Sequence, residues 1–137
     1  MADDPARVAD TRAWLVKSSN DLRAAQVDMA AEPPILEDVM FHCQQVVEKA
    51  LKAFLTWHDR PLRKTRDLVE IGGQCAEIDP TLEALLRQAA PLTEYAWKFR
   101  YPGEPAEISR EEAEESLKLA RKVADALLTR LPAEVHP

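Results

Sequence analysis

The chain has 137 residues, a net charge of -6 and 46% apolar residues, the balance of one soluble domain large enough to bury a core without disulfides or metal. The acidic balance argues against a broad surface for duplex DNA, because binding a polyanion requires clustered positive charge. The chain has only 3 glycines, so a β-sandwich or barrel is not expected. Its apolar runs are too short to cross a bilayer and its first residues lack a secretory signal, so we expect a cytoplasmic protein without membrane contact.

Hydrophobic periodicity predicts helices throughout, and the first two are long. Residues 1–9 are polar and are expected to form a disordered lead-in. A helix is predicted from residue 10 or 11 to about residue 31, where Pro33 and Pro34 end it. The next helix is predicted over about residues 35–58 and forms the spine of the fold.

Two shorter helical segments follow the spine. A helix over about residues 67–78 is expected to be weakened or split by Gly72 and Gly73. A helix over about residues 80–100 is expected to kink or break near Pro91. Its second half contains the densest aromatic cluster of the chain.

The last helix is predicted from a capping box, in which Ser109 and Glu112 each satisfy a free backbone amide of the other. It is expected to stop before Pro132, with a frayed tail after it. Five helical segments joined by short loops predict an all-α fold, an up-and-down bundle of four or five helices. We expect a single domain over residues 1–137, with its core at about residues 10–130.

The spine helix has two different faces when its residues are placed about 100° apart. The apolar arc contains Val39, Cys43, Val46, Val47, Ala50, Leu51 and Phe54. The polar arc contains His42, Gln44, Gln45, Glu48, Lys49 and Lys52. Phe41 and Leu55 interrupt the polar arc, so they are interface candidates and we expect this face to meet a partner or ligand.

A polar stripe on that arc is formed by His42, Gln45, Lys49 and Lys52, with neighbours three or four residues apart. One interpretation is that Gln45, Lys49 and Lys52 contact a phosphate or a base, with His42 as a titrating group. The alternative is a solvated or dimer-facing stripe without a ligand.

A basic segment follows the spine helix and contains Arg60, Arg63, Lys64 and Arg66. These side chains are candidates for phosphate binding, because lysine and arginine supply charge-assisted donors. The alternative is a solvated loop that offsets an acidic protein.

The pair Arg100-Tyr101 ends the aromatic stretch. Arg100 is a candidate phosphate clamp and Tyr101 a candidate platform for base stacking. The alternative is structural, with Tyr101 in the core and Arg100 paired with Glu94 or Glu104.

No metal site and no cofactor are predicted. Cys43 and Cys75 lack the spacing of metal ligands, and Cys43 is expected to be a small buried apolar residue. The spacing of His58 and of the acidic residues 111–115 supports no metal site either. The acidic run is better explained by stabilisation of a helix N-terminus.

Segments along roughly residues 12–128 resemble the HEPN superfamily of small helical-bundle proteins. The most specific signature is in the spine helix, where a phenylalanine, a cysteine, two glutamines, a glutamate and a lysine keep the family order. The matching segments are Trp14-Leu15, Asp21-Leu22, Ala24-Ala25, Phe41–Leu55, Lys64-Thr65, Asp67-Leu68 and Leu92–Pro102.

The resemblance implies a four- or five-helix bundle like the substrate-binding subunit of nucleotidyltransferases, usually homodimeric. Many members are encoded beside a minimal nucleotidyltransferase or fused to one. Some are metal-independent endoribonucleases of toxin–antitoxin systems, whereas others are non-catalytic and are thought to bind nucleotides or RNA.

The chain departs from the ribonuclease members, in which an arginine is followed a few residues later by a histidine. No histidine follows Arg100 within reach. Arg130 and His136 have a suitable spacing, but Pro132 lies between them and they are outside the family position, so we interpret the match as chance. Arg66 also stands where the family often has a histidine.

We therefore expect a non-catalytic nucleotide- or RNA-binding module, or the partner module of a minimal nucleotidyltransferase in a toxin–antitoxin-like system, acting as a homodimer. One alternative is a divergent metal-independent endoribonuclease that uses Arg100 with His42 or His58. Another is a structural dimerisation or assembly module without a small ligand.

Overall fold

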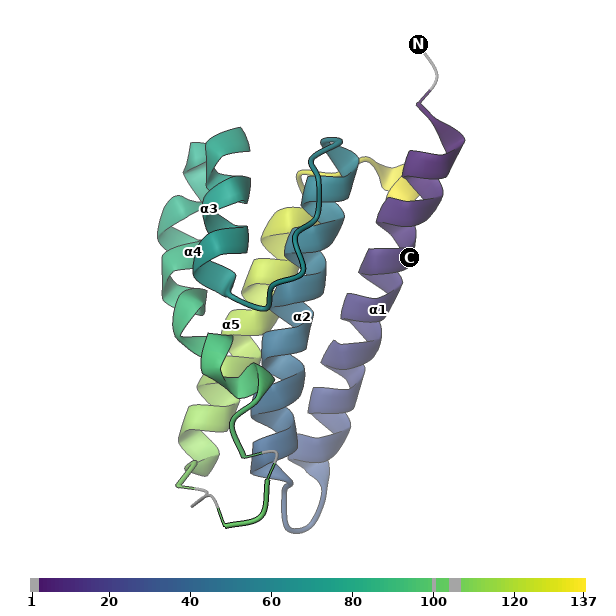
Figure 1. The fold of residues 1–137 in the computed structure, drawn as a ribbon. Helices are drawn as coiled ribbons and strands as arrows, with labels where there is room; N and C mark the ends of the chain where they lie inside the picture. The colour runs from purple at the N-terminus through teal and green to yellow at the C-terminus, as the bar shows by residue number, and fades with distance from the viewer. Residues whose placement is uncertain (1–2, 100, 104–106) are drawn as a thin grey trace.

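The regular structure of the described residues is entirely helical (Figure 1). The computed structural model describes residues 3–99, 101–103 and 107–137. Within these residues the α-helices are α1 (Pro5–Ala30), α2 (Leu36–Trp57), α3 (Leu68–Ile78), α4 (Glu83–Ala89) and α5 (Arg110–Leu128). Short 3-10 helices are η1 (Pro80–Leu82), η2 (Ala90–Ala96) and η3 (Ala133–Val135). The predicted all-α helical bundle is confirmed, and none of the described helices is long and apolar enough to cross a membrane.

The second helix, α2, is the central element of the bundle (Figure 1). It packs most extensively along α1 and also contacts α5, α3 and η2, so most of its circumference is covered. Its apolar arc is fully buried, with Val46, Val47 and Ala50 at 0% exposed. Leu55 is also in this core, at 1% exposed, so it packs inside the bundle and the prediction that it is an interface residue is wrong. The helical wheel shows the angle of a side chain, but the neighbouring helices decide what covers it.

The first helix begins earlier than predicted, because Asp4 and Pro5 form a strong helix start. The Asp4 carboxylate accepts a hydrogen bond from the backbone amide of Ala6, and Pro5 occupies the first turn, where its missing amide costs little. The expected disordered lead-in over residues 1–9 is therefore wrong for residues 5–9. The buried stripe of α1 contains Thr11, Leu15, Ser18, Asp21 and Ala25, so this helix presents polar groups to the bundle.

The third helix continues through its two glycines without a break. Asp67 caps it by accepting from the backbone amide of Val69 at 2.9 Å. Gly72 is buried, and a Cβ atom there would lie 3.5 Å from the Cβ of Leu86 in α4. Packing of α3 against α4 therefore outweighs the low helix propensity of glycine.

The expected break near Pro91 is present, since α4 ends at Ala89 and η2 begins at Ala90. The predicted helical second half is instead a 3-10 helix that ends at Ala96. The chain then turns, and Phe99 has a positive φ of 65°.

The C-terminal tail is docked onto the bundle, so the prediction of a frayed tail is wrong. Val135 is 0% exposed, and the Nε2 of His136 lies 2.9 Å from the carbonyl oxygen of Leu128 and 3.0 Å from that of Leu131. The ring of His136 therefore has a structural role at the end of α5. This role agrees with the interpretation that the spacing of Arg130 and His136 matches the ribonuclease motif by chance.

Asp79 ties the junction of α3 and η1 to the end of α5. Its carboxylate accepts from the backbone amide of Thr81 at 3.0 Å and from the Nε of Arg130 at 2.8 Å. The hydroxyl of Thr81 and the guanidinium of Arg130 hold the pKa of Asp79 below its usual value of 3.8.

Asp79→Ala is expected to lower the melting temperature and to weaken the loss of stability on acidification. The pKa of Asp79 is lower in the folded protein than in the unfolded chain. Its carboxylate therefore stabilises the fold at pH values above the usual pKa of 3.8, and this stabilisation is lost as the pH falls through the folded pKa. Urea unfolding at neutral and strongly acidic pH measures both effects. Asp67→Ala, which removes a helix cap without an arginine contact, is the control at neutral pH. An unchanged pH dependence in Asp79→Ala would contradict this role.

Both cysteines are buried thiols. Cys43 and Cys75 are 0% exposed, and burial raises the pKa of each thiol to about 12. The Sγ of Cys75 lies 3.6 Å from the carbonyl oxygen of Leu51.

The native protein is therefore expected to resist a thiol reagent at mildly alkaline pH, since the reactive thiolate is scarce and covered. In urea, both thiols should react with the reagent together, at the rate of global unfolding measured by circular dichroism. Fast modification of one thiol in the native protein would show local opening around it.

Candidate functional site

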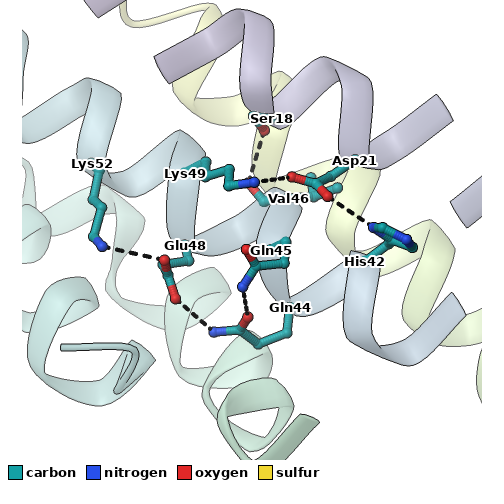
Figure 2. A network of polar contacts seen from close by, with 9 residues as sticks. All are labelled: Ser18, Asp21, His42, Gln44, Gln45, Val46, Glu48, Lys49 and Lys52. Atoms are coloured by element: carbon teal, nitrogen blue, oxygen red, sulfur yellow. Dashed lines mark hydrogen bonds and ion pairs between the residues drawn. The ribbon is translucent and has the colours of Figure 1, made fainter. Parts of the chain in front are cut away.

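A polar network crosses the interface between α1 and α2 (Figure 2). Asp21 of α1 is 8% exposed and lies between two basic side chains of α2. Its Oδ2 accepts from the Nζ of Lys49 at 2.5 Å, and its Oδ1 lies 2.8 Å from the Nδ1 of His42. Ser18, one turn earlier, donates to the carbonyl oxygen of Val46 at 2.8 Å. These contacts set the register of the two helices, because each needs one particular partner on α2.

A second series of hydrogen-bonded polar side chains lies on the other side of α2 (Figure 2). Glu48 is 5% exposed and accepts from the Nζ of Lys52 at 3.2 Å and from the Nε2 of Gln44 at 3.1 Å. Gln45 donates to the side-chain oxygen of Gln44 at 2.6 Å. The buried polar groups of this series thus provide hydrogen-bond partners for one another, as buried polar groups require.

Gln44 also connects α2 to the loop that follows it. Its Nε2 donates to the carbonyl oxygen of Arg66 at 3.2 Å, and the Nη1 of Arg66 donates to the carbonyl oxygen of Ala96 at 3.2 Å. The backbone amide of Leu68 donates to the Oγ1 of Thr93 at 3.0 Å. Arg66 therefore holds the end of η2, and with it the start of the segment that follows.

That segment closes a hollow at the beginning of α2, which we name the α2 hollow. It has a volume of about 360 Å³ and is lined by Glu37, Asp38, Phe41, His42, Lys98 and Phe99. The rings of Phe41 and His42 meet edge to face, with centroids 5.3 Å apart. The Nζ of Lys98 lies 5.1 Å from the ring centroid of Phe99. The α2 hollow combines aromatic walls with both signs of charge.

His42 has a carboxylate near each ring nitrogen. Asp21 holds its Nδ1, and its Nε2 lies 3.8 Å from the Oδ2 of Asp28. Burial and the nearby charge of Asp38 raise the pKa of Asp28, and His42 partly opposes this. The ring of His42 is therefore oriented between two carboxylates at the wall of the hollow.

The polar stripe is only partly available to a ligand. Gln45 is 7% exposed, and Lys49 and Lys52 are held in ion pairs with Asp21 and Glu48. The stripe is thus covered by α1 and by its own hydrogen bonds, and the solvated alternative is wrong for Gln45.

The other candidates lie apart from one another. Arg63 pairs with Glu70 at 2.8 Å, whereas Lys64 is exposed. Tyr101 is 73% exposed and so is not in the core, while Arg100 lies outside the described residues. The structure brings His42 and Phe41 to the α2 hollow and leaves the basic loop elsewhere.

Asp21, Asp28 and Glu48 are the important residues that sequence reasoning left out of the site. The burial of Asp21 could have been predicted, because its helical spacing from Leu15 and Ser18 places it on the buried stripe of α1. A carboxylate on such a stripe requires a cation opposite it.

The comparisons place the chain in a family. A family model described as HEPN domain matches residues 11–131, and the chain belongs to this family. HEPN domains are modules related to nucleotides and RNA. No curated protein and no solved structure matches the chain.

Asp21→Ala is expected to lower the free energy of unfolding by about 3 kcal/mol, because removing one partner of a buried ion pair leaves the other charge unpaired. Denaturant unfolding measures the change. Asp125→Ala, at an exposed position of α5, is the matched control and should change it by less than about 0.5 kcal/mol. Equal losses in the two variants would show that the Asp21 network does not hold α1 on α2.

Proposed function

We propose that this member of the HEPN family is a non-catalytic module that binds single-stranded RNA or nucleotides and serves a minimal nucleotidyltransferase in a toxin–antitoxin-like system. The observation that carries the binding proposal is the α2 hollow, in whose wall the Nζ of Lys98 lies 5.1 Å from the ring centroid of Phe99. Near Lys98 and Phe99 in the sequence, Trp97 and Tyr101 are 54% and 73% exposed.

Each part of this surface has a counterpart in single-stranded RNA. Exposed rings such as Trp97 and Tyr101 offer stacking platforms for unpaired bases. Lys98 is paired with Glu94 at 3.4 Å, but both side chains are exposed, so this weak ion pair can give way to a phosphate, unlike the buried pairs of Lys49 and Lys52. Glu37 and Asp38 can accept hydrogen bonds from ribose hydroxyls or base amino groups. The net charge of -6 favours such a small, mixed site over a long basic groove.

The environments of the histidines favour binding over cleavage. A general base needs a ring nitrogen directed at the substrate, but both nitrogens of His42 lie near carboxylates. His136 is held by backbone carbonyls, and His58 contacts the ring of Phe54 at the opposite end of α2.

One observation favours a second candidate, the divergent endoribonuclease. Asp21 orients the ring of His42 in the way that a carboxylate orients a catalytic imidazole. In this candidate a substrate hydroxyl would replace Asp28 at the Nε2 of His42.

The binding proposal predicts that Trp97→Ala weakens binding of a labelled single-stranded RNA by about tenfold, since stacking of one base contributes about 1–3 kcal/mol. Lys98→Ala should weaken it as well, whereas Lys122→Ala, at an exposed position of α5, should not. Fluorescence anisotropy measures the affinities. Equal affinities in all variants would reject the α2 hollow as the binding site.

The same RNA, incubated with the protein without metal, separates the two candidates. An unshortened RNA on a denaturing gel is expected for a binding module. Cleavage that disappears in His42→Ala would establish the endoribonuclease instead. The nucleotidyltransferase role is supported by family membership alone, and co-purification with a minimal nucleotidyltransferase encoded beside this chain tests it.

A further inference from the structure

A second hollow lies at the opposite end of the bundle, where the first turns of α1 meet the end of α2. We name it the Trp14 hollow, and its lining includes Asp10, Trp14, Lys17, Asp59, Arg60 and Leu62. Its volume is about 480 Å³, within the range of about 300–1,000 Å³ that small-molecule sites occupy. Figure 1 shows this end of α1 and α2 far from the loop that joins them, which lies near the α2 hollow.

The wall that α1 supplies presents three chemical groups in a fixed order. Asp10, Trp14 and Lys17 follow one another four and three residues apart, so they share one face of the helix. At 1.5 Å per residue, the step from Asp10 to Lys17 covers about 10 Å along the helix axis. This wall therefore offers a negative charge, an aromatic ring and a positive charge in a line.

The indole in the middle of that line is held in place by the protein. Trp14 is half-buried and packs against the core, and the Nζ of Lys52 lies 5.4 Å from its ring centroid. Lys52 is in turn paired with the buried Glu48 at 3.2 Å, so its own position is fixed. The surface of the indole that stays open, together with Leu62 at 39% exposed, forms a preformed contact for an apolar side chain.

The charges at the two ends of the line are available to a ligand. Asp10 and Lys17 are exposed, and within the described residues neither makes a hydrogen bond through its side chain or an ion pair. Lys49 and Lys52 of α2 differ from them, because both are ion-paired inside the bundle. A ligand with charges of both signs can therefore contact Asp10 and Lys17 without displacing an internal partner.

The end of α2 supplies a second pair of opposite charges, Asp59 and Arg60, on a rigid turn. The amide of Asp59 donates to the carbonyl oxygen of Thr56 at 3.1 Å, and that of Arg60 donates to Leu55 at 2.9 Å, the paired hydrogen bonds that close many helices. Asp59 has a φ of 54°, the left-handed conformation that aspartate tolerates better than most residues. The backbone thus fixes the starting points of an acidic and a basic side chain at the rim.

The two charges on this turn also lack partners of opposite sign. Both side chains are exposed, and in the part of the chain that the structure describes neither forms an ion pair. Burial lowers the pKa of the neighbouring His58, and the positive charges of Arg60 and Arg7 lower it further, whereas Asp79 opposes them. The charge of Arg60 is therefore felt by its surroundings and is open to an external acceptor.

We propose that the Trp14 hollow binds a short peptide with free ends, about three residues long and with a large apolar side chain at its centre. An extended chain spans about 3.3–3.6 Å per residue, so the terminal charges of a tripeptide lie about 10 Å apart, as Asp10 and Lys17 do along α1. The terminal ammonium donates to Asp10, the terminal carboxylate accepts from Lys17, and the central side chain packs on Trp14. Asp59 accepts from a peptide amide, and Arg60 donates to a peptide carbonyl oxygen.

This peptide site goes beyond the RNA-binding proposal, because none of its residues lines the α2 hollow. The carboxylates of Asp10 and Asp59 also favour a ligand that carries a positive charge over a polyanion, which they would repel. A peptide at one end and RNA at the other would occupy the same molecule together. The two proposals can therefore fail separately.

Isothermal titration of the full chain with the tripeptide Gly-Phe-Gly tests the site. This peptide is expected to bind, whereas its N-acetylated form, its C-amidated form and Gly-Ala-Gly should each bind about tenfold more weakly or worse. Each of these changes removes one of the three matched groups, which are the ammonium, the carboxylate and the ring.

Variants assign each end of the peptide to its residue. Lys17→Gln should weaken binding of Gly-Phe-Gly about tenfold and leave binding of the C-amidated peptide unchanged, because that peptide has no carboxylate to lose. Asp10→Asn should likewise weaken binding of Gly-Phe-Gly but not that of the N-acetylated peptide. Arg23→Gln, at an exposed position of α1 outside the hollow, is the matched control and should bind as the wild type does.

The proposal is overturned if Gly-Phe-Gly does not bind at millimolar concentration, if the blocked peptides bind as tightly as it does, or if Arg23→Gln loses as much affinity as the hollow variants. Binding of AMP in place of Gly-Phe-Gly would also reject it. Anisotropy with single-stranded RNA completes the design, and the Asp10 and Lys17 variants should bind RNA normally. RNA binding that fails while peptide binding persists would reject the α2 hollow and leave the Trp14 hollow standing.

Discussion

The pairing of the buried Asp21 carboxylate with Lys49 and His42 is the interaction on which the arrangement of the bundle depends. Apolar contacts between helices tolerate small shifts, but a buried charge needs its partner at one position. Because the stripe of α1 that faces the bundle includes Thr11 and Ser18, the place of this helix is set largely by such polar matches. With α1 in register, α2 is covered along its length and both ends of the bundle take their shapes.

Much of the fold could be predicted from the sequence, because its signals are local. The end of α2 and the start of α5 were predicted within a residue or two, from apolar periodicity and from the cap at Ser109. The burial of Leu55 and of the C-terminal tail inside the bundle could not be predicted from such local signals. Their burial depends on neighbours far away in the chain, and one helical wheel contains no information about them.

The candidate site could be predicted only in part, for the same reason. His42 and Phe41 were placed on a face that meets something, and they do line a hollow. Lys49 and Lys52 are candidate ligand contacts in the sequence, but in the structure they are paired with Asp21 and Glu48. A cation on a helix face has the same appearance in sequence whether it binds a ligand or a carboxylate of its own chain. Only the three-dimensional register of the helices distinguishes the two.

The docked tail has a consequence for how the domain fits into a larger assembly. The 3-10 helix η3 packs against α1, and the nearby Asp3 carboxyl group raises the pKa of Glu134. The beginning of α1 and the C-terminal segment therefore lie at the same end of the bundle. A protein that contacts this end of the bundle would leave the α2 hollow, at the beginning of α2, uncovered.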